Sequence, residues 1–155
     1  MSEEKLIASN TAARHHYTIE EVVEAGLVLT GTEVKSLRTH APQLRESFVE
    51  VRPHGAHFEA WLVNTHIAPY AFGNIWNHEP LRRRKLLLHV HQLKKLYGAI
   101  LQKGMTVVPL RLYFKNGLVK AELGLGKGKK QHDKRQDLKR KADDREIARA
   151  LRKSD

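Results

Sequence analysis

The chain has 155 residues and a formal charge of +11, which suits one domain of ordinary size with an appendage. It contains no cysteine, so a disulfide framework and a cysteine-based zinc module are excluded. No apolar segment approaches membrane-spanning length, and Met1-Ser2-Glu3-Glu4 does not resemble a secretion signal. We therefore expect a soluble, cytoplasmic protein that makes no membrane contact.

Positive charge is spread along the whole chain. Residues 126–155 hold 12 Lys and Arg against six Asp and Glu, and residues 1–125 hold 16 against 11. A compact body that ends in a flexible cationic arm is typical of proteins that handle nucleic acid. A solvated, solubilising tail would have the same composition, so charge alone leaves both interpretations open.

The first half of the chain predicts strands and one short helix. Residues 1–13 are polar and small, which predicts a mobile N-terminal arm. Residues 17–29 alternate and are rich in β-branched side chains, with a turn or bulge expected at residues 24–26. Thr30 offers a hydroxyl cap to a short helix over residues 33–38.

A hairpin and an irregular segment are expected next. Residues 48–51 and 58–63 have the composition of two strands, and the Pro and Gly at residues 53–55 predict the turn between them. Residues 64–80 contain Pro69, Gly73 and Pro80 without a hydrophobic period, so we expect no regular structure there.

The last part of the body carries the clearest patterns. Apolar residues at positions 93, 96, 97, 100 and 101 predict a helix that ends at Gly104. Residues 106–114 and 118–125 flank Asn-Gly, the strongest short-range hairpin signal. Because side chains alternate along a strand, Lys120 points away from the face that carries Val119 and Ala121.

These elements amount to about six strands, one long helix and one or two short ones. We therefore predict a mainly β fold, a small antiparallel barrel of oligonucleotide-binding type with one to three helices. The barrel domain is expected over residues 14–125, and a basic C-terminal tail over residues 126–155. Gly126 and Gly128 loosen the backbone where the tail begins.

We find no arrangement that predicts an enzyme, a metal site or a cofactor. Ten histidines are present, but neither His15-His16 nor His89-x-His91 has a carboxylate or a third histidine at metal-ligand spacing. The acidic residues of the body are scattered, and no phosphate-binding glycine loop is present. Histidines on the surface could instead stack on bases or donate to phosphate.

A basic loop is expected at Leu81-Arg82-Arg83-Arg84-Lys85. The arginine guanidinium binds phosphate through two parallel hydrogen bonds and also stacks on bases. These properties favour RNA contacts for Arg82, Arg83 and Arg84. A solvated loop remains the alternative.

Three stretches resemble one family. They are residues 24–38 (EAGLVLTGTEVKSLR), residues 82–89 (RRRKLLLH) and residues 126–135 (GKGKKQHDKR). Together they resemble SmpB, the SsrA-binding protein family of bacterial trans-translation. The resemblance implies a non-enzymatic protein that binds the tRNA-like domain of transfer-messenger RNA (tmRNA) and delivers it to stalled ribosomes. It also implies elongation factor Tu as a neighbour on alanyl-tmRNA, and a free protein that is a monomer with a disordered tail.

The resemblance also implies roles for individual residues. The positions that would grip tmRNA are Glu24, Leu87, His89 and Lys120. In the tail, which would enter the decoding site and the empty mRNA channel, the implied contacts with the ribosome and its small-subunit RNA are Lys129, Lys130, His132, Asp133, Lys134, Arg135, Ala150 and Leu151.

Two other functions remain open. A general ribosome-associated protein or RNA chaperone would share the basic barrel and tail, but it should bind ordinary tRNA as well as tmRNA. A small RNA-cleaving enzyme should degrade RNA and lose activity when His89 or His15 is replaced.

Overall fold

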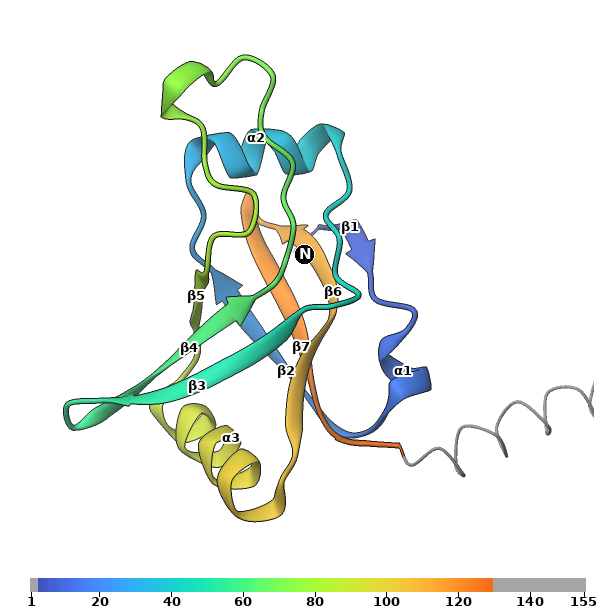
Figure 1. The fold of residues 1–155 in the computed structure, drawn as a ribbon, viewed down its shortest axis with the longest axis vertical. Helices are drawn as coiled ribbons and strands as arrows, with labels where there is room; N and C mark the ends of the chain where they lie inside the picture. The colour runs from blue at the N-terminus through green and yellow to red at the C-terminus, as the bar shows by residue number, and fades with distance from the viewer. Residues whose placement is uncertain (1–2, 130–155) are drawn as a thin grey trace, which may run out of the picture.

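The computed structural model describes residues 3–129, which form seven strands, three α-helices and one 3₁₀ turn (Figure 1). In chain order the elements are β1 Glu4–Ser9, α1 Ala13–His16, β2 Tyr17–Leu27, α2 Gly31–Thr39, β3 Phe48–His54, β4 His57–Val63, η1 Asn74–Trp76, β5 Arg84–Leu87, α3 Val90–Lys103, β6 Thr106–Lys115 and β7 Leu118–Gly128.

The strands close into an antiparallel barrel. Their order is β1-β6-β3-β4-β5-β2-β7, and an additional pairing of β6 with β7 closes the ring, with β1 attached to β6. Val49 of β3 faces Val107 at the start of β6, while β1 pairs along the second half of β6, from Arg111 to Lys115. This closed arrangement confirms the predicted mainly β barrel of oligonucleotide-binding type.

The N-terminal segment differs from the mobile arm predicted over residues 1–13. Glu4–Ser9 form strand β1, with Leu6 opposite Tyr113 of β6, and the short helix α1 follows from Ala13. The reason is the open edge of β6, which β3 meets only near its start. The unpaired backbone N–H and C=O groups on that edge bond to β1. This pairing is long-range, so no local sequence pattern predicts it.

Turns follow the local sequence closely. Asn116 and Gly117 both have positive φ, 54° and 77°, as a two-residue hairpin turn between right-twisted strands requires. The β3–β4 hairpin turns at Gly55, one position later than the centre of the predicted turn, so both strands are longer than expected. Strand β2 runs unbroken through residues 24–26, and its register shift lies between Ile19 and Glu21 instead.

Each of the two longer helices has one end where the sequence predicted it, the start of α2 at the Thr30 cap and the end of α3 at Gly104. The Thr30 side chain accepts from the Glu33 N–H at 3.4 Å, and the Thr30 N–H donates to the Glu33 carboxylate at 2.8 Å, which closes a capping box before α2. Helix α3 ends at Gly104 with φ 63°. Figure 1 shows α2 across one end of the barrel and α3 across the other.

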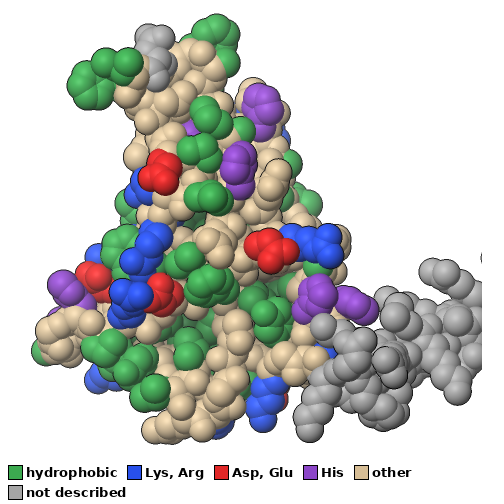
Figure 2. All heavy atoms as spheres, viewed as in Figure 1, with side chains coloured by type: hydrophobic (Ala, Val, Ile, Leu, Met, Phe, Trp, Pro, Cys, Tyr) green, Lys and Arg blue, Asp and Glu red, His purple; other side chains and the backbone are tan. Residues whose placement is uncertain are grey.

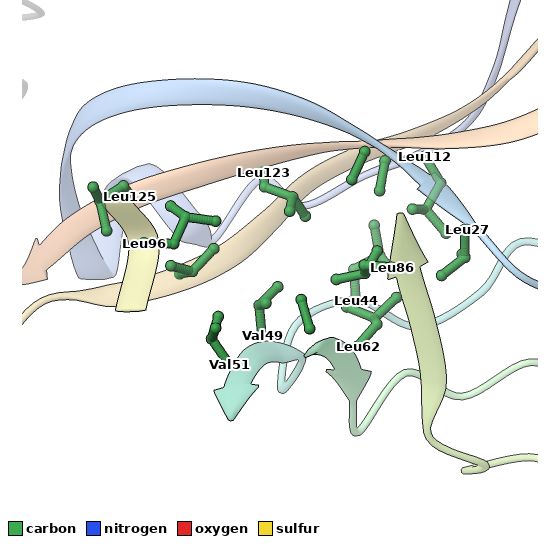
Figure 3. Close-up of a cluster of buried hydrophobic side chains, with 14 of the residues drawn as sticks. Leu27, Leu44, Val49, Val51, Leu62, Leu86, Leu96, Leu112, Leu123 and Leu125 are labelled. Carbon is green, nitrogen blue, oxygen red and sulfur yellow. The ribbon is translucent and has the colours of Figure 1, made fainter. Parts of the chain in front are cut away.

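The core lies inside the barrel and beneath α3 (Figure 3). Val119, Ala121 and Leu123 of β7 are all buried, as their alternation predicted. Leu93 and Leu96 of α3 pack into the same cluster, so α3 plugs that end of the barrel. The sheet thereby becomes rigid enough to hold side chains on its outer surface in fixed positions.

Candidate nucleic-acid interface

A depression of about 400 Å³ lies on the outer surface where β2, β7 and the β5–α3 junction meet. We call it the groove, and its lining residues are Glu24, Ala25, Gly26, Leu87, Leu88, His89, Gln92 and Lys120. All four residues that the family resemblance implied for tmRNA contact, from three strands and a helix cap, therefore border one groove.

Strand register brings these residues together. Gly26 of β2 faces Leu87 of β5 on one side and Lys120 of β7 on the other. A β-carbon at Gly26 would lie 3.4 Å from the Leu87 Cβ and 3.7 Å from the Lys120 Nζ. The glycine thus leaves the floor of the groove open between an apolar and a cationic side chain.

Glu24 presents a charged carboxylate at the rim. Its side chain is 41% exposed, and its Oε2 accepts from the Tyr113 hydroxyl and from the Lys115 ammonium at 3.3 Å. The hydrogen bond from Tyr113 lowers the pKa of Glu24 against the opposing effect of burial, and Lys115 lowers it further. Burial and the same hydrogen bond raise the pKa of Tyr113, so the phenol keeps its proton and donates it.

The side chains of Leu87 and His89 are exposed to solvent. Leu87 is 55% exposed, so it does not belong to the core although it follows the buried Leu86. His89 is the N-cap of α3, and its ring stacks on that of His91 with centroids 5.7 Å apart. The Gln92 side chain accepts from the His89 N–H at 3.0 Å and so holds the strand-to-helix corner in place.

The groove therefore combines three kinds of chemistry. The Glu24 carboxylate can accept from base N–H groups or from ribose 2′-hydroxyls, and the Lys120 ammonium can bind phosphate. Leu87 offers apolar surface for a base or sugar, and the His89 ring offers a stacking face or a donor. The combination suits the exposed sugars, phosphates and base edges of a folded RNA.

The three consecutive arginines have three different environments. Arg82 is one-third exposed and donates to Glu33 at 2.6 Å, while Arg83 is 44% exposed and lies over the Trp61 ring at 5.3 Å. Arg84 is fully buried and bonds to Glu33, so the prediction of an RNA contact for Arg84 is wrong. Because Arg84 begins β5 and not a loop, alternation turns its side chain inward.

In the buried pair of Arg84 and Glu33, burial and hydrogen bonding shift each pKa in opposite directions. Burial alone would raise the pKa of Glu33, but hydrogen bonds from Arg82, Thr30 and Arg84 lower it overall. Burial lowers the pKa of Arg84, and the bond to Glu33 opposes that shift. Both groups remain charged and hold α2 against β5.

Only the first of the predicted tail contacts can be placed. Lys129 follows β7, and its N–H donates to the His16 carbonyl at 2.8 Å. The other predicted tail residues lie outside the described residues: Lys130, His132, Asp133, Lys134, Arg135, Ala150 and Leu151.

Residues 3–129 show neither a metal-binding cluster nor a membrane-spanning helix. In that range, no group of three or more His, Asp or Glu side chains lies close enough to hold a metal ion. No helix within the same range is long and apolar enough to cross a membrane.

Sequence reasoning missed three groups at the groove, namely Gln92, Tyr113 and Lys115. The two-residue turn at 116–117 contained a usable signal, because it pairs Tyr113 with Lys120 across the hairpin. No comparable signal connects Tyr113 with Glu24, which lies 89 positions away in the chain.

The closed barrel and its charged outer groove define a small basic β-barrel protein of oligonucleotide-binding type. Residues 7–153 match the family model described as SmpB protein. An SsrA-binding protein from Geobacter sulfurreducens is 58% identical over 149 residues, which cover 96% of this chain and 95% of the relative. Another from Enterococcus faecalis is 55% identical over 150 residues, covering 97% and 95%. The chain belongs to the SmpB family.

A solved structure agrees with this assignment. Its description is "tmRNA-SmpB: a journey to the center of the bacterial ribosome", and one of its chains superposes with a TM-score of 0.62. That chain is 46% identical to this one, and the match covers 80% of this chain and 85% of that chain.

Proposed function

We propose that this protein is a cytoplasmic, non-enzymatic RNA-binding protein that holds the tRNA-like domain of tmRNA and delivers it to stalled ribosomes in trans-translation. The observation that carries the proposal is the groove, where strand pairing gathers Glu24, Leu87, His89 and Lys120. Relatives of high identity are named SsrA-binding proteins, and a solved relative is described with tmRNA, which supports the same partner.

In this proposal the barrel recognises the shape and the charge of the folded RNA. Lys120 neutralises a phosphate, Glu24 accepts from a base edge or a 2′-hydroxyl, and Leu87 covers an apolar face of the RNA. His89 stacks on a base or donates to the backbone. Arg82 and Arg83 lie on the neighbouring surface and bind phosphates, while counterion release supplies much of the affinity.

The tail supplies the ribosome contact. We assign Lys129 and Lys130 to small-subunit RNA phosphates and residues 132–135 to the decoding centre, with Ala150 and Leu151 further along the empty mRNA channel. In this proposal the tail senses a stalled ribosome, because it enters the mRNA channel only where no message fills that channel. The protein acts as a monomer, alongside elongation factor Tu on alanyl-tmRNA.

A competition titration tests the RNA partner. Purified protein is titrated with the tRNA-like domain of tmRNA at two salt concentrations, with alanine tRNA as competitor. Tight binding that survives excess tRNA is expected. Equal binding to both RNAs, weakening together as salt rises, would identify a general basic RNA binder instead.

A truncation separates the two halves of the proposal. Strand β7 continues to Gly128, so residues 130–155 can be removed without shortening the barrel. The truncated protein should bind the tRNA-like domain like the full chain and fail to support tagging of stalled peptides. Equal loss of both activities would contradict this division of roles.

A further inference from the structure

The loop between β4 and β5 carries an exposed apolar tip. Phe72, Ile75 and Trp76 are 79%, 87% and 84% exposed, the highest values among the large hydrophobic side chains of residues 3–129. Figure 1 shows this loop beyond the barrel end that α2 covers, and Figure 2 shows apolar side chains at the corresponding extremity. We call these three residues the tip.

The base of the loop is firmly held. The Asn77 side-chain amide donates to the Tyr70 carbonyl at 2.6 Å and accepts from the Tyr70 N–H at 3.1 Å. His78 is buried and bonds to the Ile67 carbonyl and the Thr32 hydroxyl, each at 2.9 Å. A loop whose base is fixed by hydrogen bonds and whose three large apolar side chains are exposed to solvent is typical of an interaction site.

Helix α2, which contacts the base of the loop, presents two cations to solvent. Lys35 and Arg38 of α2 are exposed, and the Lys35 ammonium lies 5.6 Å from the Tyr70 ring at the base of the loop. Glu33, the acidic residue of α2, is fully buried against Arg82 and Arg84, so its charge is not presented to a partner. The exposed carboxylate of Glu79 partly offsets these cations.

Two exposed apolar residues lie, along the chain, between groove residues and the elements at the base of the loop. Val28 follows the groove residue Gly26, is 45% exposed, and accepts from the Arg82 guanidinium at 3.4 Å through its carbonyl. Leu81, beside Arg82, is 52% exposed and precedes β5. One partner can therefore follow the surface from the groove to the loop.

We propose that Phe72 and Trp76 stack on an unpaired base of the same RNA that occupies the groove, while Lys35 and Arg38 bind its phosphates. Aromatic faces beside cations suit single-stranded nucleotides, because rings bind bases and ammonium or guanidinium groups bind the backbone. An apolar protein partner would gain nothing from the two cations. This inference rests on the proposed function for the identity of the RNA.

A single-tryptophan variant reports on the tip directly. The chain has two tryptophans, Trp61 and Trp76, so Trp61→Phe leaves Trp76 as the sole reporter. Its emission should be quenched on titration with the tRNA-like domain, in proportion to the RNA bound. Unchanged Trp76 emission at full occupancy of the groove would overturn the proposal.

Substitutions then separate stacking from charge. Phe72→Ala with Trp76→Ala should weaken binding of the tRNA-like domain by about fivefold or more and leave its salt dependence unchanged, because no charge is lost. Lys35→Ala with Arg38→Ala should weaken binding and flatten the salt dependence. Leu118→Ala, which removes another exposed apolar side chain, at the β6–β7 turn, is the control and should bind like the wild type.

Other occupants give different results. Quenching that appears only with ribosomal subunits, or on raising the protein concentration without RNA, would place ribosomal RNA or a second copy of this chain on the tip and refute the proposal. Failure of the proposed function gives a different result from failure of this inference. In that case excess alanine tRNA would displace the tRNA-like domain from the protein, whether or not Trp76 emission changes.

Discussion

Arg84 donates to Glu33 inside the protein, and both side chains are fully buried. The same guanidinium donates to the Thr65 carbonyl at 2.6 Å and to the Pro80 carbonyl at 3.0 Å. One arginine thereby ties β5 to α2 and to both ends of the irregular segment between β4 and β5. The pair therefore anchors the segment between β4 and β5 that carries the tip.

Breaking this pair should destabilise the fold. Arg84→Ala removes the buried partner of Glu33, which keeps only Arg82 and the Thr30 N–H, and it also removes the donor to the Thr65 carbonyl. We expect a loss of about 3–5 kcal/mol in the free energy of unfolding. Arg83→Ala is the control, because its exposed pair with Glu50 should contribute only about 0–1 kcal/mol. Denaturant unfolding measures both, and equal stability of the two variants would contradict the role given to Arg84.

The buried carboxylate of Glu33 should make the free energy of unfolding fall in acid. The folded-state pKa of Glu33 is lowered from its ordinary 4.5, so its contribution is fully present above that value and is lost as pH falls through the lower folded-state pKa. Stability measured from pH 6 downwards should therefore decline below about pH 4.5. Glu33→Gln should reduce that slope, and an unchanged slope would show that other carboxylates cause it.

Lys120 should contribute one phosphate contact to RNA binding. Lys120→Ala is expected to lower affinity for the tRNA-like domain and to reduce the slope of log affinity against log salt by about 0.7–0.9. Lys103→Ala removes an exposed lysine at the end of α3, outside the groove, and should change neither quantity comparably. Equal effects from both lysines would mean that only total charge matters.

Tyr113 should act on RNA binding through Glu24. Tyr113→Phe removes the largest cause of the lowered Glu24 pKa, so that pKa should rise, as carboxyl NMR titration can measure. RNA affinity should then fall, most strongly in mildly acidic buffer where more Glu24 is protonated. Tyr97→Phe, on a ring packed against Phe58, serves as control and should leave the Glu24 titration as it is.

Two glycines near the end of β7 should respond differently to alanine. A β-carbon at Gly126 would lie 2.6 Å from the Thr18 carbonyl oxygen of β2, whereas one at Gly128 would meet nothing within 4 Å. We expect Gly126→Ala to cost about 1–3 kcal/mol of stability through forced backbone movement. Gly128→Ala should be close to neutral, and thermal unfolding that cannot separate the variants would count against the closeness of β2 and β7.

Much of the fold could be predicted because its signals are local. Asn116-Gly117 sets a hairpin by favouring positive φ, Thr30 and Glu33 close a capping box within four residues, and the apolar period of α3 needs only its own sequence. The chain also carries three long family motifs, and the comparisons confirm the family that they indicated. Strand β1 escaped prediction because its partner, β6, lies about a hundred residues away.

The groove shows what the sequence by itself determined and what only the tertiary structure decided. The sequence determined which residue types are present, and motif resemblance selected Glu24, Leu87, His89 and Lys120. Only the barrel decides that they border one groove, because strand register places Gly26 between Leu87 and Lys120. The tertiary structure also turned Arg84 inward beside the exposed Arg83, since the side chain of a residue on a closed sheet faces either the core or solvent.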